Sequence, residues 1–297
     1  MPSRRALLQS ALLSLPLLAT GRAWARLPAD AGDAPDDLET LDRRHGGRLG
    51  VFALDTGTGR TLGHRGDERF AMCSTFKLLL AAQVLAAVDA GEERLDRRLT
   101  WTPDDLVSWS PVVEKHDGAA GLPVAALCEA TMTISDNTAA NLLLAEHGGP
   151  AGLTAWLRGI GDTVTRLDRN EPTLNEATPG DPRDTTTPAA MVATLQKLLL
   201  GDVLSNASRR LLTDWALANQ TGDKRLRAGL PGWRVGDKTG TNNIGNTNDI
   251  GILWPPGDRA PILVAAYYAE STSTPAQRDA VLADVGRRVG QWALTGA

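Results

Sequence analysis

The stretch GRLGVFALDTGTGRTLGH, residues 47–64, decides the fold class because it contains two short runs of strand-forming residues around a tight turn. The turn is Gly57-Thr58-Gly59, a sequence typical of the connection between neighbouring strands. A two-stranded hairpin is only marginally stable in water by itself. These strands therefore need partner strands from elsewhere in the chain.

Strand-forming stretches return near the C-terminus. They are GWRVGDKTG at 232–240, TNDIGILWP at 247–255 and APILVAAYYAE at 260–270. Pairing of the two sets of strands would bury the apolar faces of both. Helical patterns lie at 36–46, before the first strand, and at 275–294, after the last. We therefore predict a discontinuous α/β domain, residues 26–68 and 220–297, in which N- and C-terminal helices flank an antiparallel sheet.

The middle of the chain, residues 69–219, changes to the 3.6-residue periodicity of amphipathic helices. The helical runs are STFKLLLAAQVLAAVDAG (74–91), LPVAALCEATMTIS (122–135), NTAANLLLAEHGG (137–149), GLTAWLRGIG (152–161), TPAAMVATLQKLLLG (187–201) and ASRRLLTDWALANQ (207–220). We expect an all-helical domain inserted into the α/β domain. One segment interrupts it, RLDRNEPTLNEATPGDPRDTTT at 166–187, which is polar and rich in turn formers. Long loops of this kind are often functional.

The composition is that of an ordinary globular protein, with 297 residues, 42% apolar and 22% charged, and a formal net charge of -4. No basic block follows the N-terminal segment, so nucleic acid would have little electrostatic attraction for the chain. We expect no nucleic-acid partner. The two cysteines and four histidines show no metal-binding spacing, and we expect neither a metal nor a cofactor.

The first 25 residues have the parts of an export signal. They combine the pair Arg4-Arg5, an apolar run at 11–19 and the cleavage pattern Ala23-Trp24-Ala25. The start SRRALLQ resembles a twin-arginine signal, with a generic positive n-region as the alternative. The apolar run is shorter than the roughly 20 residues that span a bilayer. We expect a periplasmic protein with no membrane attachment once the signal is removed.

Three short motifs carry candidate chemistry: Ser74-Thr75-Phe76-Lys77, Ser135-Asp136-Asn137 and Lys238-Thr239-Gly240. Ser74 and Lys77 are one helical turn apart on the same face, so an amine lies near a hydroxyl that needs a base to become nucleophilic. Each motif alone is more often a helix cap or a turn. All three in this order form the motif set of class A β-lactamases and penicillin-binding proteins.

The sequence resembles the class A serine β-lactamases over essentially the whole mature chain. The matching stretches are MCSTFK (72–77), SDNTAANLLL (135–144), RLDRNEPTLN (166–175), GDPRDTTTP (180–188) and VGDKTGT (235–241). The resemblance implies a β-lactamase/transpeptidase-like fold, a monomer, and an omega loop at about 166–187 closed by an ion pair between Arg169 and Asp184. It also implies a hydrolase that opens the β-lactam amide bond of penicillins and cephalosporins through a serine acyl-enzyme, giving antibiotic resistance.

The resemblance implies a role for each catalytic residue. Ser74 would be acylated by the β-lactam carbonyl, whose oxyanion would be bound by the backbone N–H groups of Ser74 and Thr241. Ser135 would pass a proton to the departing ring nitrogen. Glu171 would activate the water that hydrolyses the acyl-enzyme. Either Lys77 or Glu171 would be the base in acylation, and the sequence leaves both open.

Substrate binding is implied for a second group of residues: Trp109, Asn137, Asn175, Lys238, Thr239, Thr241 and Arg225. Lys238, Thr239 and Thr241 would hold the substrate carboxylate. Asn137 would bond the acylamino side chain, and Trp109 would be the aromatic residue at the rim of the site.

The chain departs from the family pattern at two places. Many relatives have an arginine on the strand after K-T-G, where this chain has Asn246-Thr247-Asn248, so Arg225 is expected to supply the cation instead. Cys128 matches a position that forms a disulfide in some members, but its partner position is Ala81. Cys73 lies eight residues before Ala81, about 12 Å along a helix, so we expect no Cys73–Cys128 bond.

Two other functions remain as alternatives. A penicillin-binding transpeptidase or carboxypeptidase would share the serine and the lysine but would deacylate antibiotics poorly. Glu171 and Asn175, which would hold the hydrolytic water between them, favour the hydrolase. A non-catalytic β-lactam sensor or cell-wall binding domain would usually need a transmembrane link, and the sequence has no apolar run long enough to form one.

Overall fold

The structure is a computed structural model that describes residues 35–295; the export signal predicted for residues 1–25 lies outside this range. A five-stranded sheet with the order β2-β1-β9-β8-β7 forms its centre, and every pairing is antiparallel. The strands are β1 (Arg48–Asp55), β2 (Thr61–His64), β7 (Arg234–Thr241), β8 (Thr247–Trp254) and β9 (Ile262–Ala269). The antiparallel sheet predicted from the two ends of the chain is confirmed.

The pairing of β1 with β9 joins the two ends of the chain. Its register places Arg48 opposite Ala269 and Asp55 opposite Ile262, so all eight residues of each strand are paired. On the other side of β9, β8 and then β7 extend the sheet. The N-terminal hairpin thus obtains the partners that its marginal stability requires.

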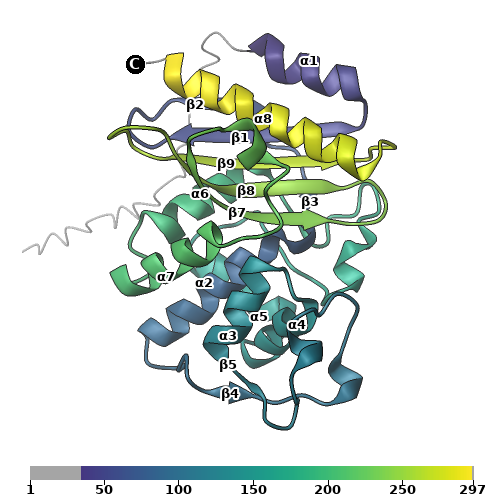
Figure 1. The fold of residues 1–297 in the computed structure, drawn as a ribbon, viewed down its shortest axis with the longest axis vertical. Helices are drawn as coiled ribbons and strands as arrows, with labels where there is room; N and C mark the ends of the chain where they lie inside the picture. The colour runs from purple at the N-terminus through teal and green to yellow at the C-terminus, as the bar shows by residue number, and fades with distance from the viewer. Residues whose placement is uncertain (1–34, 296–297) are drawn as a thin grey trace, which may run out of the picture.

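The sheet separates two layers of helices (Figure 1). The helices α1 (Pro35–His45) and α8 (Pro275–Thr295) lie against one face, and the helices of the middle segment lie on the other side. The flanking helices predicted at 36–46 and 275–294 are therefore present. Because both faces of the sheet are covered, its inner strands β8 and β9 are buried almost throughout.

Strand β9 contributes side chains to the hydrophobic cores on both faces of the sheet. Its residues alternate between two hydrophobic cores, since successive side chains of a strand point to opposite faces. Leu263, Ala265 and Tyr267 belong to the core shared with the middle helices. Val264, Ala266 and Tyr268 belong to the core shared with α1 and α8. A continuous apolar run therefore replaces the alternation of a half-exposed strand.

The middle segment forms the predicted helices. They are α2 (Phe76–Asp89), α3 (Val124–Thr133), α4 (Asn137–Glu146), α5 (Gly149–Gly159), α6 (Pro188–Leu199) and α7 (Asn206–Leu217). Short 3₁₀ turns connect them: η1 (Cys73–Thr75), η2 (Pro103–Asp105), η3 (Val113–Lys115) and η4 (Thr173–Glu176), with η5 (Leu226–Gly229) before β7. The helix predicted from Ser74 thus begins as a 3₁₀ turn and becomes α-helical at Phe76.

Two short strand pairs lie outside the main sheet, and the sequence did not predict them. They are β3 (Phe70–Ala71) with β6 (Thr185–Thr186), and β4 (Arg98–Leu99) with β5 (Leu122–Pro123). Two residues are too few to show a periodic pattern. The pair β3–β6 attaches the end of the omega loop beside the turn that carries Ser74. The division into domains at residues 69 and 219 stays a prediction.

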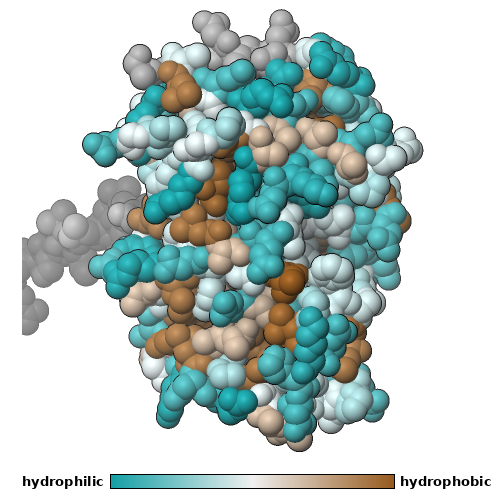
Figure 2. Space-filling model, in the orientation of Figure 1, coloured by the Kyte–Doolittle hydropathy of each residue, from teal (hydrophilic) through white to brown (hydrophobic). Residues whose placement is uncertain are grey.

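Hydrophilic residues predominate on the face of the molecule shown in Figure 2, and apolar residues form smaller patches between them. Within residues 35–295, no helix has both the length and the apolar character that a bilayer span requires. The same residues contain no group of three or more His, Cys, Asp or Glu side chains placed to hold a metal ion. Cys73 and Cys128 are both free and buried.

Candidate active site

Ser74 lies on the turn η1, against the strand that carries the K-T-G motif. Gly240 of β7 approaches this turn so closely that a Cβ there would lie 2.6 Å from the Met72 carbonyl oxygen and 3.2 Å from the Ser74 nitrogen. A side chain at residue 240 would push the strand away from the serine. The glycine of K-T-G therefore brings the first and third motifs together.

Lys77 is fully buried beneath Ser74, one turn along α2. Its ammonium group donates hydrogen bonds to the Ser135 carbonyl oxygen at 2.8 Å and to Asn137 Oδ1 at 2.5 Å. It also lies 3.1 Å from Glu171 Oε1. Burial lowers the pKa of Lys77, and the carboxylate of Glu171 opposes that change. A lysine with a lowered pKa can more readily serve as a base.

Glu171 faces the nucleophile from the omega loop. Ser74 Oγ donates a hydrogen bond to Glu171 Oε1 at 3.0 Å, and Asn175 Nδ2 donates to Glu171 Oε2 at 2.6 Å. Glu171 and Lys77 are thus both placed near the Ser74 hydroxyl. The structure leaves both candidates for the acylation base in position.

Asn141 is a site residue that the sequence reasoning missed. Its Oδ1 accepts a hydrogen bond from the Glu171 backbone nitrogen at 3.0 Å, and its Nδ2 donates to the Glu171 carbonyl oxygen at 2.8 Å. These bonds hold the backbone that carries the carboxylate. The sequence did contain a signal for this residue in its spacing. Asn141 follows the predicted site residue Asn137 by four residues and so lies on the same face of α4.

The predicted ion pair that closes the omega loop is confirmed. Arg169 Nε lies 2.6 Å from Asp184 Oδ2, and Asp184 is completely buried. Asp184 Oδ1 also accepts hydrogen bonds from the backbone nitrogens of Asp168 at 2.7 Å and Arg169 at 3.0 Å. A single carboxylate therefore joins the two ends of the loop.

Ser135 lies between the two lysines of the site. Lys238 Nζ donates a hydrogen bond to Ser135 Oγ at 3.0 Å, and Lys77 Nζ lies 3.3 Å from the same atom. Burial lowers the pKa of Lys238 well below its usual value, and the nearby charges of Lys77 and Arg225 lower it further. The Ser135 hydroxyl is thus in contact with two amines that can exchange protons with it.

A cleft of about 710 Å³ opens over these residues. Its lining includes Ser74, Trp109, Ser135, Asn137, Asn175, Thr239, Thr241 and Arg225, all predicted from the sequence. Trp109 is 62% exposed, and its indole nitrogen donates to the Ile134 carbonyl oxygen at 3.0 Å. Ile244, which is 55% exposed, was not predicted. It lies in the loop after β7, whose sequence NNIGN has no periodic pattern.

Arg225 is buried at the edge of the cleft, with 8% of its surface exposed. Its guanidinium donates to Thr241 Oγ1 at 2.6 Å, to the Asn248 carbonyl oxygen at 2.8 Å and to Asp279 Oδ1 at 2.8 Å. With these contacts, Arg225 is not a freely solvated surface charge. A second arginine, Arg278 of α8, also reaches this region and was not predicted.

Arg278 Nε donates to Thr247 Oγ1 at 2.9 Å, and the residue is 7% exposed. Thr247 belongs to the run Asn246-Thr247-Asn248, which itself carries no cation. The closing helix therefore brings an arginine into contact with that position from a distant part of the chain. No short motif in the sequence signals this contact.

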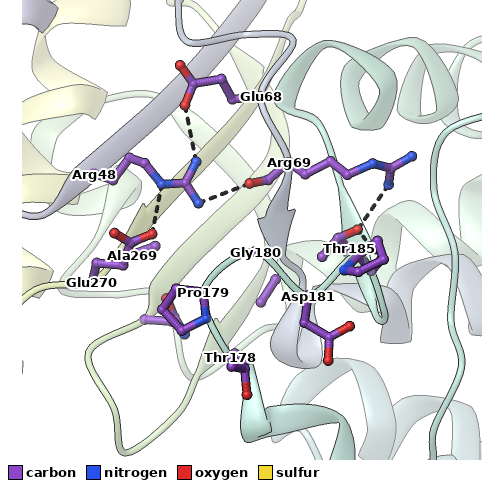
Figure 3. A pocket seen from close by; sticks show the side chains of 14 residues that line it. Arg48, Glu68, Arg69, Thr178, Pro179, Gly180, Asp181, Thr185, Ala269 and Glu270 are labelled. Carbon is purple, nitrogen blue, oxygen red and sulfur yellow. Dashed lines mark hydrogen bonds and ion pairs between the residues drawn. The ribbon is translucent and has the colours of Figure 1, made fainter.

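A second cavity, of about 440 Å³, is lined by omega-loop residues 177–182 and by side chains near the sheet, among them Arg48 and Arg69 (Figure 3). Arg48 lies 3.2 Å from Glu68 and 2.9 Å from Glu270, so its charge is already paired. The cavity contains none of the residues predicted for the site. The cleft over Ser74 is therefore the candidate active site.

Comparisons with known proteins agree with this geometry. The family model described as the beta-lactamase enzyme family matches residues 34–293. Beta-lactamase L2 of Stenotrophomonas maltophilia is 52% identical over 279 residues, which cover 93% of this chain and 92% of the relative. The solved structure of an ancestral class A β-lactamase has a TM-score of 0.85 and 67% identity, covering 86% of this chain and 98% of that one.

A β-lactamase from Xanthomonas campestris has a TM-score of 0.84 and 54% identity to this chain, covering 86% of this chain and 95% of that one. Together, these matches confirm the family resemblance and the fold class predicted from the sequence. The chain belongs to the β-lactamase enzyme family, as a class A serine β-lactamase.

Proposed function

We propose that this enzyme hydrolyses the amide bond of penicillins and cephalosporins through an acyl-enzyme on Ser74, and that it thereby confers resistance to these antibiotics. One observation carries the proposal. Ser74 Oγ lies 3.0 Å from Glu171 Oε1, and Lys77 Nζ lies 3.1 Å from the same carboxylate oxygen. A nucleophile and an amine that both contact one carboxylate are suited to acyl transfer and then hydrolysis.

In acylation, Ser74 Oγ attacks the β-lactam carbonyl carbon, and its proton passes to Lys77 or Glu171. The backbone N–H groups of Ser74 and Thr241 stabilise the oxyanion. The carbon–nitrogen bond of the ring then breaks, and Ser135 gives its hydroxyl proton to the ring nitrogen. Ser135 is suited to this step because both of its amine neighbours can replace the proton.

In deacylation, Glu171 takes a proton from a water molecule that attacks the ester carbonyl. Asn175 holds this water together with Glu171. Ser74 leaves with a proton, and a ring-opened acid is released. A penicillin-binding transpeptidase would lack this efficient step, so the buried Glu171 beside Ser74 supports hydrolysis over that alternative.

A further set of residues binds the substrate. Lys238, Thr239, Thr241 and Arg225 hold the carboxylate of the substrate, since charge-assisted hydrogen bonds are the strongest available to an anion. Asn137 bonds the acylamino group. Trp109 contributes an exposed aromatic surface at the rim.

We also propose that the mature enzyme acts as a monomer in the periplasm after export, without a metal or a cofactor. The N-terminal sequence with its arginine pair supports export. Nucleic acid is not expected as a partner, because the formal net charge is -4.

Intact-mass spectrometry tests the mechanism. The wild type should turn over benzylpenicillin, Ser74→Ala should form no adduct, and Glu171→Ala should accumulate a covalent adduct at Ser74. Asp181→Ala removes a carboxylate of the same loop that is paired with Arg183 and does not line the cleft, and this variant should still turn over. A Glu171→Ala variant with wild-type turnover would refute the role of Glu171. A wild type that forms only a stable adduct would favour a penicillin-binding protein or a sensor.

A further inference from the structure

A chain of four hydrogen-bonded side chains runs from the cleft into the interior. Thr239 and Thr221 both line the cleft, and their Oγ1 atoms lie 2.5 Å apart. Thr221 Oγ1 lies 2.7 Å from Asn219 Oδ1, and Asn219 Nδ2 lies 3.0 Å from Asp237 Oδ1. Thr221, Asn219 and Asp237 had no role in the sequence reasoning. The series of hydrogen bonds thus begins at Thr239, one of the residues proposed to bind the substrate carboxylate.

One backbone group fixes the direction of every hydrogen bond between these four side chains. The Thr221 backbone N–H can only donate, and it lies 3.0 Å from the side-chain amide of Asn219. The amide must therefore turn its oxygen toward Thr221 and its NH₂ group toward Asp237. This assignment does not depend on whether the Asp237 carboxyl is ionised.

The hydroxyl groups are then assigned in turn. Asn219 Oδ1 can only accept, so the Thr221 hydroxyl gives it the single hydrogen that it carries. Thr221 Oγ1 can consequently only accept from Thr239. In the free enzyme, the Thr239 hydrogen therefore points toward Thr221 Oγ1 and is already used in that hydrogen bond.

The frame behind Thr221 is rigid. Asn219 is 2% exposed, and Arg227 donates to its carbonyl oxygen at 3.1 Å and to Asp237 Oδ1 at 2.6 Å. A Cβ at Gly222 would lie 1.7 Å from Asp237 Oδ2, so the turn after Thr221 packs directly on this carboxyl. Thr221 therefore cannot reverse its own hydrogen bond without breaking the contacts of Asn219.

A carboxylate offers only acceptors, so Thr239 must turn its hydrogen from Thr221 to the substrate in order to bond it. We propose that Thr221, oriented by Asn219, is a positioning residue. It accepts the hydrogen of the Thr239 hydroxyl in the free enzyme and so weakens the binding of carboxylate-bearing ligands. This inference rests on the proposed function. The ring-opened product carries the same carboxylate, so the arrangement also favours product release.

Binding measured without turnover tests the proposal. In a Ser74→Ala background, Thr221→Val removes the acceptor but keeps the branched shape, and the Kd for benzylpenicillin should fall by about 2- to 10-fold, the equivalent of one net hydrogen bond. Thr221→Ala should also lower the Kd. Thr221→Ser keeps the hydroxyl and should retain the original Kd. Titration calorimetry gives these values, and thermal unfolding checks that each variant is folded.

A ligand without the carboxylate separates this role from a structural one. The Kd for the methyl ester of benzylpenicillin should be the same in the Thr221→Val and parent proteins. If Thr221→Val and Thr221→Ala leave the Kd for benzylpenicillin unchanged or raise it, the proposal is wrong. Equal tightening for the ester would also overturn it. Failure of the proposed function would be seen separately, as a protein with Ser74 intact that does not hydrolyse benzylpenicillin.

Discussion

At the scale of single residues, the site concentrates buried positive charge beneath an open cleft. Lys77 and Lys238 are fully buried and Arg225 nearly so, and each is held by hydrogen bonds to oxygen atoms. Burial lowers the pKa of both lysines, and Lys238 is lowered further by its cationic neighbours. A bound carboxylate would relieve this repulsion, because it brings a negative charge next to several positive ones.

Arg225 provides the first prediction. Arg225→Ala should lower kcat/KM for a penicillin by roughly 10- to 150-fold, the kinetic equivalent of a charge-assisted hydrogen bond of about 1.5–3 kcal/mol. Arg225→Lys should recover only part of the loss, because an ammonium cannot reproduce the planar fork that contacts Thr241 and Asp279. Steady-state kinetics measures both effects. Wild-type kcat/KM and melting temperature in Arg225→Ala, with a loss in Lys238→Ala, would show that Arg225 is not needed.

The thiols provide the second prediction. Cys73 and Cys128 are free and fully buried, and burial raises the pKa of each thiol. A thiol reagent should react slowly with the native protein, because it attacks the thiolate and needs access to it. Titration of the denatured, unreduced protein should find both thiols. A denatured protein with no reactive thiol would contain the disulfide that the helix geometry argues against.

At the scale of elements, the omega loop places Glu171 through contacts at both its ends and its middle. In the middle of the loop, Asn141 of α4 is hydrogen-bonded to the backbone of Glu171. Asp184, near the end of the loop, binds Asp168 and Arg169 near its start. Neutralising Asp184 would leave Arg169 paired with Glu176 alone and would weaken the hydrogen bonds that Asp184 accepts from the backbone of Asp168 and Arg169. The position of the catalytic carboxylate should therefore depend on Asp184, which does not touch the substrate.

Asp184→Asn is the third prediction. The variant should lose stability of about 1.5–3 kcal/mol, typical of a hydrogen bond to a charged group, and its acyl-enzyme should persist longer than that of the wild type. Urea denaturation and stopped-flow detection of the acyl-enzyme measure the two effects. Asp181→Asn, in the same loop, breaks only a local pair with Arg183 and serves as the control. Equal behaviour of the two variants would contradict the role given to Asp184.

At the scale of the whole molecule, the sheet lies between two cores and also buries acidic groups. Asp237 of β7 and Asp249 of β8 are completely buried. Burial raises the pKa of Asp249 well above its ordinary value, and the neighbouring Asp237 raises it further. The pKa of Asp237 is also raised by burial, against the effect of Arg227. These carboxyls therefore bind protons more tightly in the folded state than in the unfolded chain.

The fourth prediction follows by linkage. A raised folded-state pKa gives stability that is complete below the ordinary aspartate pKa of about 4 and is lost as the pH rises toward the raised value. The stability that Asp249 contributes should therefore decline from about pH 4 upward, so the wild type should lose free energy of unfolding relative to Asp249→Asn as the pH rises. Urea denaturation across that range measures it. The exposed Asp258→Asn variant should keep the pH dependence of the wild type, and an Asp249→Asn variant with that same pH dependence would refute the prediction.

Much of the fold and of the site could be predicted from local patterns. The runs at 47–64 and 260–270 are apolar enough to require burial, and they form the joined strands β1, β2 and β9. The motifs containing Ser74, Ser135 and Lys238 give nucleophile and amines whose order along the chain matches a known family. Such signals survive in a sequence because they depend on neighbours a few residues away.

Tertiary structure decided the rest. Three features of the site depend on residues that are far apart in the sequence. They are the contact of Arg278 with Thr247, the hydrogen bonds of Asn141 to the Glu171 backbone, and the direction of the hydrogen bond at Thr239. Periodicity tells which face of an element is buried, but not which side chain it meets there. That choice is made when backbones pack within a few ångströms, as Gly240 allows beside Ser74, and every buried polar group must then find a partner.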